Sequence, residues 1–433
     1  MTDELECTTL GAWKINSTAG QMRQLLTLIS CGVLFLGMVS GCSDSNNSGN
    51  GKNEELNRIL DFDNYTWTEI DSGSHWEPRA GLRALELDGR FFVMGGRTPR
   101  PPMTDPPIPG DSDIWSDVWV SEDRGVSWRE ILGTGGEHWA PRAYFQALVK
   151  DEWLYVLGGQ DYSLVELPFC AGQPPEICPP FVSQSQFFND VWRSKDGISW
   201  DMMTDNAGWA GRAGLSAALL GDEMFVLGGS TNDDTAIIGG PPTRIYYNDV
   251  WKSRDGSSWT RVTESAPWAA RAGAVLVTKG EYLYLLGGEF GFLCEPQPDC
   301  ELPYFNDVWR SMDGANWEQV TGSAGWSPRP GHQCGVIQDN FICFGGFGLP
   351  ANPTDVWVSE DGADWELLDQ APWNARSPEE IKYDFDIIVT DADSVDPRPA
   401  IYTFGGDRET FDFNDPLNYL RIDDDVWIFT LPE

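Results

Sequence analysis

The stretch Asn189-Asp190-Val191-Trp192-Arg193-Ser194-Lys195-Asp196-Gly197-Ile198-Ser199-Trp200 decides the fold, because the chain repeats it. It returns almost unchanged at Asn248 to Trp259 and at Asn306 to Trp317, and in looser form from Ser116 to Trp128 and from Thr354 to Trp365. Each copy reads as a short apolar strand, a tight turn rich in Asp and Gly, and a second strand that opens on Trp. Self-similarity at a period of roughly sixty residues indicates a repeat architecture.

Three further marks recur in phase with this stretch, and each occurs six times. The first is Trp-x-x-Arg, at Trp76/Arg79, Trp139/Arg142, Trp209/Arg212, Trp268/Arg271, Trp326/Arg329 and Trp373/Arg376. The second is an apolar run that closes on Gly-Gly, at Gly95, Gly158, Gly228, Gly287, Gly345 and Gly405. The third is Asp-Val-Trp, which begins at Asp117, Asp190, Asp249, Asp307, Asp355 and Asp425. The chain therefore contains six equivalent units.

Each unit predicts four strands: one after the Arg (a), one into Gly-Gly (b), one through Asp-Val-Trp (c) and one from the second Trp (d). The sixth unit stops after strand c, and the missing strand d is found at 65–70, before the first Trp-x-x-Arg. Pairing of 65–70 with 426–429 would close a ring and remove two open sheet edges. The sequence thus predicts an all-β, six-bladed propeller over 65–433, closed by an N-terminal strand in the last blade.

The Gly-Gly that ends strand b and the Trp that opens strand d resemble the kelch repeat family of β-propellers. The turn from Ser121 to Trp128 is similar to the Asp-box, S-x-D-x-G-x-T/S-W, of sialidase-like propellers, and the other four turns are one residue shorter. The resemblance implies the fold but transfers no active site. The paired Tyr and His that hold copper in kelch-type galactose oxidases are not found, and Tyr144 and Glu289 match the sialidase Tyr–Glu pair by type only.

The N-terminal region predicts export. Residues 1–21 carry no pattern and suggest that Met22 is the natural start. Residues 22–41 have a charged head, a short apolar core and small residues, as in a secretory signal, and the ending resembles a bacterial lipobox. That resemblance implies lipidation of Cys42, a flexible tether over 42–64 and a place in the bacterial cell envelope, on the periplasmic or surface side of the outer membrane. The alternative is an ordinary signal peptide with a chance Cys.

The composition excludes several partners. A net charge of −38 is too acidic for nucleic acid or for an anionic membrane surface, so membrane contact is expected through the lipid anchor only. Six blades account for the length as one domain, and a monomer without a cofactor is expected. No phosphate-binding loop, nucleophile elbow or zinc motif is present, and with three His and no Cys-x-x-Cys no metal site is expected.

Six cysteines beyond Cys7, Cys31 and Cys42 form three close pairs, which predicts disulfides in an oxidising compartment. Metal ligation is the alternative. The pairs are Cys170/Cys178, Cys294/Cys300 and Cys334/Cys343. The first two pairs each share a b–c loop. Alignment on Gly-Gly places a two-residue turn at Gln338-Asp339, which sets Cys334 directly opposite Cys343 on neighbouring strands.

The six repeat arginines allow two interpretations. Sialidases bind a carboxylate with an arginine cluster, but a residue present in every blade more simply serves a purpose that every blade shares. We therefore expect a structural role, such as pairing with the Asp of Asp-Val-Trp, for Arg79, Arg142, Arg212, Arg271, Arg329 and Arg376. The Asp residues of the c–d turns are likewise expected to form turns.

Candidate ligand-binding residues are sought where the repeat is broken. The positions directly after Gly-Gly should lie near the mouth of the central channel; they are Arg97, Gln160, Ser230, Glu289, Phe347 and Asp407. Tyr144 replaces the small residue that follows Arg-Ala elsewhere, and His332 begins an inner strand, while His75 and His138 each precede a repeat Trp. Glu289 with Asp407 or His332 could act as acid and base. The alternative is that these are ordinary polar residues at a wet pore mouth.

The leading functional hypothesis is a lipid-anchored binding module for a glycan or an envelope protein, acting through the face that carries the b–c and d–a loops. The alternative is a carbohydrate-active enzyme resembling the kelch-type sialic acid mutarotases or a sialidase-like glycosidase. A third possibility is a scaffold in an envelope complex. Convergence of acid, base and Arg in one pocket would favour the enzyme, and an open aromatic face would favour binding.

Overall fold

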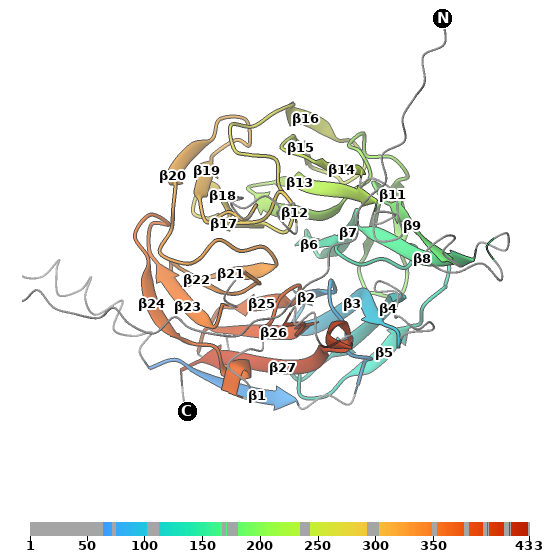
Figure 1. Cartoon of the computed structure of the whole chain (residues 1–433), viewed down its shortest axis with the longest axis horizontal. Coiled ribbons are helices and arrows are strands. Elements are labelled where there is room, and N and C mark those ends of the chain that lie inside the picture. Colours follow the sequence, from blue (N-terminus) through green and yellow to red (C-terminus); the bar gives the residue numbers. More distant parts are fainter. Residues whose placement is uncertain are drawn as a thin grey trace, which may run out of the picture. The chain divides into compact units, whose positions relative to one another are not determined.

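The described residues fold into six four-stranded antiparallel sheets arranged in a ring (Figure 1). The computed structural model describes residues 64–71, 75–101, 112–166, 170, 181–233, 243–291, 303–348, 353–375, 381–392, 396, 398–410, 415 and 417–431. The predicted six-bladed β-propeller is confirmed. The predictions for 1–63, including the signal, the tether and Cys42, lie outside the described residues. None of the helices within the described residues has the length and apolar character needed to cross a membrane.

Each blade runs from strand a at the channel to strand d at the periphery. Blade 1 consists of β2 (Arg83–Leu87), β3 (Arg90–Pro99), β4 (Ser112–Ser121) and β5 (Arg129–Leu132). Blade 2 consists of β6 (Gln146–Lys150), β7 (Trp153–Leu157), β10 (Val191–Ser194) and β11 (Asp201–Thr204). Blade 3 consists of β12 (Ala213–Leu220), β13 (Glu223–Asp233), β15 (Val250–Ser253) and β16 (Thr260–Thr263).

The second half of the ring repeats this order. Blade 4 consists of β17 (Val275–Lys279), β18 (Tyr282–Leu286), β19 (Val308–Ser311) and β20 (Glu318–Thr321). Blade 5 consists of β21 (His332–Ile337), β22 (Asn340–Gly345), β23 (Asp355–Ser359) and β24 (Glu366–Gln370). Blade 6 consists of β25 (Asp386–Thr390), β26 (Ala400–Asp407), β27 (Ile422–Thr430) and the N-terminal β1 (Thr66–Asp71). Two short 3₁₀ helices, η3 (Pro372–Ala375) and η4 (Asn418–Leu420), belong to the connections of blade 6.

The b–c and d–a connections of such a meander emerge on one side of the ring, here called the loop face. Two b–c connections on this face contain strands of their own that the sequence did not predict. In blade 2, β8 (Gln160–Glu166) pairs with β9 (Phe181–Phe187) as a separate hairpin. In blade 3, β14 (Thr243–Tyr246) pairs with the extension of β13. These pairings continue strand b beyond Gly-Gly.

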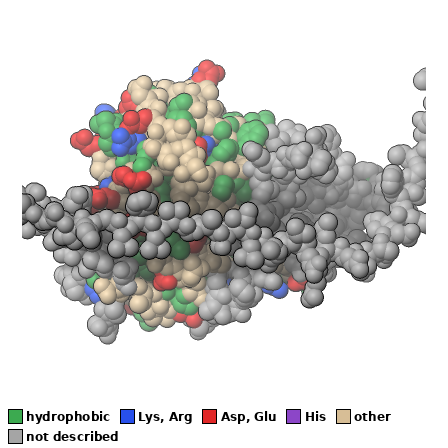
Figure 2. All heavy atoms as spheres, turned by 60° about the vertical axis from the view of Figure 1, so that its left-hand side comes forward, with side chains coloured by type: hydrophobic (Ala, Val, Ile, Leu, Met, Phe, Trp, Pro, Cys, Tyr) green, Lys and Arg blue, Asp and Glu red, His purple; other side chains and the backbone are tan. Residues whose placement is uncertain are grey.

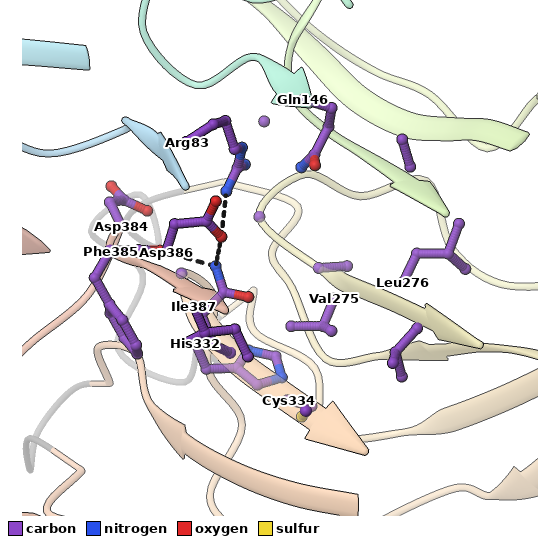
Figure 3. A pocket seen from close by; sticks show the side chains of 18 of the residues that line it. Arg83, Gln146, Val275, Leu276, His332, Cys334, Asp384, Phe385, Asp386 and Ile387 are labelled. Atoms are coloured by element: carbon purple, nitrogen blue, oxygen red, sulfur yellow. Dashed lines mark hydrogen bonds and ion pairs between the residues drawn. The ribbon is translucent and has the colours of Figure 1, made fainter. Parts of the chain in front are cut away.

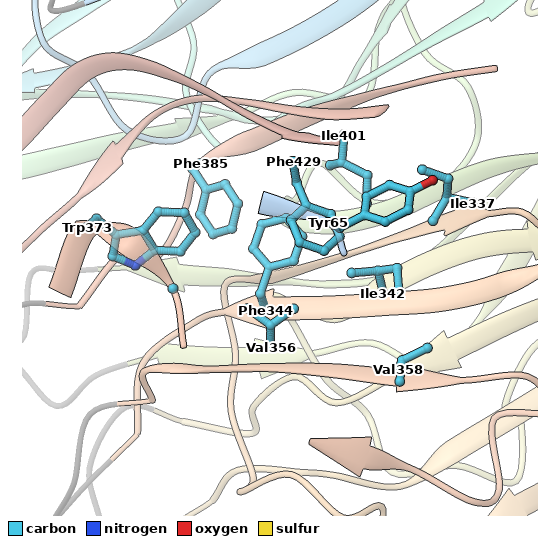
Figure 4. Close-up of a cluster of buried hydrophobic side chains, with 11 residues drawn as sticks. Tyr65, Ile337, Ile342, Phe344, Val356, Val358, Trp373, Phe385, Ile401 and Phe429 are labelled. Carbon is cyan, nitrogen blue, oxygen red and sulfur yellow. The ribbon is translucent and has the colours of Figure 1, made fainter. Parts of the chain in front are cut away.

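The predicted closure by the N-terminal strand is confirmed. β1 pairs antiparallel with β27, with Trp67 opposite Phe429 and Thr68 opposite Ile428. The preceding Tyr65 is buried and its ring lies 5.1 Å from that of Phe429. Figure 4 shows Tyr65 and Phe429 within the hydrophobic cluster that blade 6 shares with blade 5. Both termini of the propeller therefore stabilise the same blade.

The register predicted for blade 5 is also confirmed. Cys334 lies opposite Cys343 in the β21–β22 pair, and the two form a disulfide. Gln338 and Asp339 have φ values of 48° and 61°, as a two-residue hairpin turn of this kind requires. Cys170 is buried and disulfide-bonded, whereas the remaining predicted cysteine partners, Cys178, Cys294 and Cys300, lie outside the described residues.

The Asp of each c–d turn orders the turn itself. In blade 2, Asp196 accepts hydrogen bonds from the N–H groups of Ile198 and Ser199, both at 2.8 Å, and the Trp200 indole donates to the Gly197 carbonyl at 3.1 Å. The longer turn of blade 1 uses Asp123 in the same way, toward Ser127. These Asp side chains are thus occupied with the backbone, as Asp in turns commonly is.

The repeat arginine clamps three segments of its own blade together. In blade 3, Arg212 donates to both carboxylate oxygens of Asp249, at 2.6 and 3.0 Å, and to the Gly228 carbonyl at 2.9 Å. Its Nε donates to the Ala210 carbonyl, and Asp249 also accepts from the Trp251 indole. One buried guanidinium thereby joins the d–a connection, the Gly-Gly of strand b and the Asp-Val-Trp of strand c.

The same clamp is present in blades 1 to 5. The arginine–carboxylate pairs are Arg79–Asp117, Arg142–Asp190, Arg212–Asp249, Arg271–Asp307 and Arg329–Asp355. Each of these arginine side chains is 2% exposed or less. All five arginines therefore make the expected structural pairing with the Asp of Asp-Val-Trp. Their guanidinium groups are buried within the blades.

Blade 6 departs from this pattern. Asp425 pairs with Lys382, and Arg376, the partner predicted from the repeat, lies outside the described residues. Lys382 is fully buried and also lies 3.4 Å from Asp423, which in turn pairs with Arg408. Arg408 donates to the Trp373 carbonyl at 2.8 Å. In the part of blade 6 that the structure describes, two cations and two carboxylates thus form a network where the other blades have one arginine–carboxylate pair.

Removal of one clamp charge should be costly because its partner would remain buried and uncompensated. We expect Asp249→Asn to lower the free energy of unfolding by about 3–5 kcal/mol, measured by urea denaturation. The exposed pair Arg129–Glu122 provides the control, since Glu122→Gln should cost about 1 kcal/mol at most. A loss for Asp249→Asn no larger than that of the control would contradict the clamp.

Candidate functional site at the mouth of the channel

A closed ring of six backbone hydrogen bonds surrounds the channel at the loop face. Each blade contributes the residue that precedes strand a or lies at its start, and its N–H donates to the carbonyl of its counterpart in a neighbouring blade at 2.7–3.0 Å. The six residues, here called the hexad, are Gly81, Tyr144, Gly214, Gly273, Gly331 and Asp384. The ring fixes the width of the channel mouth.

All six hexad residues have a positive φ, which only Gly adopts without strain. Four blades use Gly, but blade 2 uses Tyr144, with φ 54°, and blade 6 uses Asp384, with φ 51°. A non-Gly residue in this conformation destabilises the folded state by about 1–3 kcal/mol, and such strain concentrates at functional sites. The two exceptions are both hydrogen-bonded to Gly81 of blade 1, so they flank one sector of the mouth.

Below the hexad, polar side chains that face the channel are used to join blades. The hollow has a volume of about 380 Å³ and is lined by the innermost strands. Arg83 Nε donates to the Phe145 carbonyl at 2.6 Å, Gln146 to the Leu215 carbonyl at 2.7 Å and Gln333 to the Phe385 carbonyl at 2.8 Å. Arg83 and Gln333 both bond to Asp386, and Figure 3 shows the bond from Arg83. The polar side chains at this level of the channel therefore hold neighbouring blades together.

The predicted residues after Gly-Gly lie directly beside the hexad. Arg97 forms a backbone bridge with Ala80, Gln160 with Ala143, and Glu289 with Ala272, each partner being the residue before a hexad position. Asp407 forms the same bridge with Tyr383, and Phe347 N–H donates to the Pro330 carbonyl. The structure thus places these residues at the mouth, where the sequence predicted them.

Three of the predicted candidates meet in one network between blades 6, 1 and 2. Arg97 Nε donates to the Tyr144 hydroxyl at 2.5 Å, and Arg97 Nη2 donates to Asp407 Oδ2 at 2.5 Å. The Asp407 side chain is 1% exposed and that of Arg97 is 14% exposed. We call these three residues together with Tyr383, Asp384 and Glu409 the rim site.

The carboxyl groups of the rim site repel one another. Burial and the charge of Asp407 raise the pKa of Asp384 to about 7, and Arg97 and Arg83 only partly oppose this. Burial and Asp407 likewise raise the pKa of Glu409 to about 7, against the effects of Arg97 and a hydrogen bond to Tyr383. Burial raises the pKa of Asp407 itself. Near neutral pH the rim site can therefore hold or release protons.

Aromatic side chains border the rim site on the side of blades 3 to 6. The ring of Tyr383 lies 4.9 Å from that of Phe347, which lies 5.4 Å from Tyr304. On blades 3 and 4, Tyr246 and Phe290 are 4.9 Å apart, and Phe290 is 54% exposed. Burial, then the charge of Glu289, raises the pKa of Tyr304. Glu289 thus belongs to the aromatic side of the mouth and not to the rim site.

The histidine candidates lie in other surroundings. His332 borders the channel, but its ring is 3% exposed, packs 5.4 Å from Trp326, and has no hydrogen-bond partner for either nitrogen among the described residues. It occupies the position of Leu82 and Phe145 in other blades, and burial lowers its pKa to about 3. His138 bonds the Ser116 carbonyl at 2.7 Å. His75 packs on Trp76 at 3.6 Å.

Sequence reasoning missed Tyr383, Asp384 and Glu409. In blades 1 to 5 the repeat arginine precedes the first Gly of Gly-Gly by 16 residues. In blade 6 strand a ends at Thr390 and strand b begins at Ala400, so this count fails. The sequence did identify Asp407, because it follows Gly-Gly. Its backbone pairs with that of Tyr383, so Asp407 marks the segment that the alignment missed. Within the described residues, no group of three or more His, Cys, Asp or Glu is arranged to hold a metal ion.

The geometry defines a six-bladed β-propeller with a polar site at the mouth of its channel. No protein-family model matches the chain. Among solved structures, the chain is similar to the structure of YjhT, with a TM-score of 0.51 and 15% sequence identity. The match covers 78% of this chain and 93% of that one. At this identity the likeness supports the propeller fold.

Asp384, the hexad residue with both a buried carboxyl group and a positive φ, should lower the stability of the protein. Folding raises the pKa of Asp384, so the folded state retains a proton that the unfolded chain releases, and stability falls as pH rises from about 4 to 7. Asp384→Gly removes this effect and also the strained φ. We expect it to raise the free energy of unfolding by about 1 kcal/mol at pH 4 and by more at pH 8.

Asp384→Asn is the matched control, because it keeps the backbone conformation and removes the charge alone. Its free energy of unfolding should exceed that of the unaltered protein at pH 8 but not at pH 4. Urea denaturation of the three proteins at both pH values makes the measurement. A loss of stability for Asp384→Gly at both pH values would show that the conformation is not strained.

Proposed function

We propose that this propeller is a binding module that holds a glycan at the rim site. The Tyr144–Arg97–Asp407 network is the observation that carries the proposal. It consists of residues that differ from their counterparts in other blades, so the ring itself does not require them. It also includes a strained residue, and retention of strain is expected where the side chain has a use.

The chemistry of the rim site suits a carbohydrate. Sugar hydroxyls both donate and accept hydrogen bonds, and the guanidinium, carboxyl and phenol groups here offer both roles within one sector of the mouth. The half-buried ring of Tyr144 provides apolar surface for the C–H face of a sugar. A pocket with a few converging polar groups beside aromatic side chains is typical of small-ligand sites.

A glycan array probed with the purified protein tests this proposal. We expect binding that falls at least tenfold in Tyr144→Gly, which loses the hydroxyl bonded to Arg97, because 1.4 kcal/mol of lost contact is a factor of ten. Ile198→Ser changes an exposed residue of a c–d turn, away from the loop face, and should bind normally. Retained binding in Tyr144→Gly, or loss in Ile198→Ser, would place the glycan elsewhere.

A second candidate is an enzyme that acts on the bound sugar. The observation in its favour is that Asp384 and Glu409 both have pKa values of about 7, which suits general acid–base catalysis near neutral pH. NMR spectra of the glycans that bind distinguish the two functions. An enzyme would cause anomer exchange or bond cleavage, and this activity would disappear in Asp384→Asn. A ligand that stays chemically unchanged would instead support the binding module.

We also propose that the protein is lipid-anchored in the cell envelope. The support is the lipobox-like sequence that ends at Cys42. The full gene expressed in a bacterial host should give a product that labels with palmitate and partitions into detergent. Cys42→Ala should remove both properties. A water-soluble, unlabelled product of the unaltered gene would show that the segment is an ordinary signal peptide.

A further inference from the structure

Gly81 is the residue at which the parts of the rim site meet. Its N–H donates to the Asp384 carbonyl at 2.7 Å, and its carbonyl accepts from the Tyr144 N–H at 2.9 Å. The residue before it, Ala80, exchanges two backbone hydrogen bonds with Arg97, at 2.9 and 3.0 Å. Blades 6, 1 and 2 therefore bring their contributions to the rim site together around one glycine.

The missing side chain of Gly81 makes room for the ring of Tyr144. A Cβ atom at Gly81 would lie 2.9 Å from Tyr144 Cδ1, 3.1 Å from Tyr144 Cε1 and 3.0 Å from the Tyr144 backbone nitrogen. Non-bonded carbon atoms attract one another best at about 3.5–4.0 Å. A side chain at position 81 would therefore push the Tyr144 ring out of its place.

Two other hexad glycines have the same conformation without this contact. Gly81, Gly214 and Gly273 have φ values of 63°, 58° and 61°. A Cβ atom at Gly214 would meet Ala272 Cβ at 3.3 Å, and one at Gly273 would meet Pro330 Cβ at 3.2 Å. Substitution by Ala therefore introduces the same backbone strain at all three positions, but among them only Gly81 lies against a side chain of the rim site.

The position of the Tyr144 ring affects the rest of the network. The Tyr144 hydroxyl accepts from Arg97 Nε at 2.5 Å, and Arg97 Nη2 donates to Asp407 Oδ2 at 2.5 Å. The Arg97 guanidinium also lies 5.9 Å from the centre of the Tyr144 ring. A ring displaced by a side chain at Gly81 would lose both contacts with Arg97, and these contacts help to orient the guanidinium toward Asp407.

Gly81 also differs from positions on the outer surface of the propeller. The side shown in Figure 2 carries charged side chains of both signs at its surface, and substitutions at such solvated positions usually change stability little. Gly81 is buried, so an atom added there must displace a neighbour because protein interiors are closely packed. The first neighbour that it would meet is the Tyr144 ring.

We propose that Gly81 is a positioning residue of the rim site. Its missing side chain leaves the space in which the Tyr144 ring lies, and so keeps the Tyr144 hydroxyl bonded to Arg97 and Arg97 bonded to Asp407. Gly81 acts through Tyr144 and does not itself contact the glycan. This inference rests on the proposed glycan-binding function and adds the residue that holds the binding network in place.

Gly81→Ala tests the proposal, with Gly273→Ala as the matched control because it adds the same methyl group at the same φ. Both variants should unfold at lower urea concentration than the unaltered protein. On a glycan array, only Gly81→Ala should bind about tenfold more weakly, which is the factor expected for Tyr144→Gly. In the Tyr144→Gly background, Gly81→Ala should cause no further loss of binding, since both substitutions then act on one contact.

A spectroscopic measurement separates the position of the ring from the stability of the protein. In NMR spectra of the whole protein with isotope-labelled tyrosine rings, the Tyr144 signal is identified by its absence in Tyr144→Gly. This signal should shift in Gly81→Ala and stay in place in Gly273→Ala.

Two results would overturn the role of Gly81 and leave glycan binding in place. One is an unshifted Tyr144 signal in Gly81→Ala, and the other is equal binding of the array glycans by Gly81→Ala and Gly273→Ala. If the unaltered protein binds no glycan on the array, the proposed function fails, and the role of Gly81 in it fails as well.

Discussion

The arginine clamp is the interaction on which the blade depends. One guanidinium joins the start of strand a, the Gly-Gly of strand b and the Asp-Val-Trp of strand c, as Arg212 does through Gly228 and Asp249. This explains why the three sequence marks recur together, since each supplies one part of a single contact. The clamp also sets where strand a begins, and so positions each hexad residue at the channel mouth. A buried ion pair of this geometry favours one arrangement because any other would leave a buried charge unpaired.

The functional features lie where this pattern is interrupted. In the described part of blade 6, Lys382 and Arg408 pair with Asp425 and Asp423, and the same blade contributes Asp384 to the hexad and Asp407 and Glu409 to the rim site. Blade 2 contributes Tyr144, and blade 1 contributes Arg97 between them. The other blades keep Gly at the hexad and carry uncharged or aromatic residues beside it, except for Glu289. The propeller therefore has one distinct sector on an otherwise regular ring.

Much of the fold could be predicted from the sequence because each repeat mark has a local physical meaning. Gly-Gly fixed the alignment, and through it the two-residue turn at Gln338-Asp339 and the Cys334–Cys343 disulfide. The missing sixth strand d led to the pairing of β1 with β27. The mouth positions of Arg97 and Asp407 followed from the same alignment, whereas Tyr144 was noticed only because it replaces a small residue after Arg-Ala. Strands β8, β9 and β14 extend the pairing beyond Gly-Gly, as β3 with β4 does in blade 1, but they lie in b–c loops whose sequences differ between blades, so repetition could not reveal them.

The rest of the site depends on contacts between blades, which a repeat pattern does not encode. Asp384 belongs to the hexad only through hydrogen bonds to Gly331 and Gly81 of neighbouring blades. His332 looked like a polar candidate, but its position is one that packs against Gly287 and Trp326 of blades 4 and 5. Residues of neighbouring blades therefore decide whether a polar side chain stabilises the ring or is free to contact a ligand.

The central claim is that repeated residues hold the ring and that the irregular sector of blades 6, 1 and 2 holds the ligand. A crystal structure of the protein with a bound glycan tests this most directly. The account predicts electron density for the sugar in contact with Arg97, Asp384 and Glu409, with the five arginine–aspartate clamps intact. Density over another sector, or a clamp arginine turned outward to bind the sugar, would contradict it.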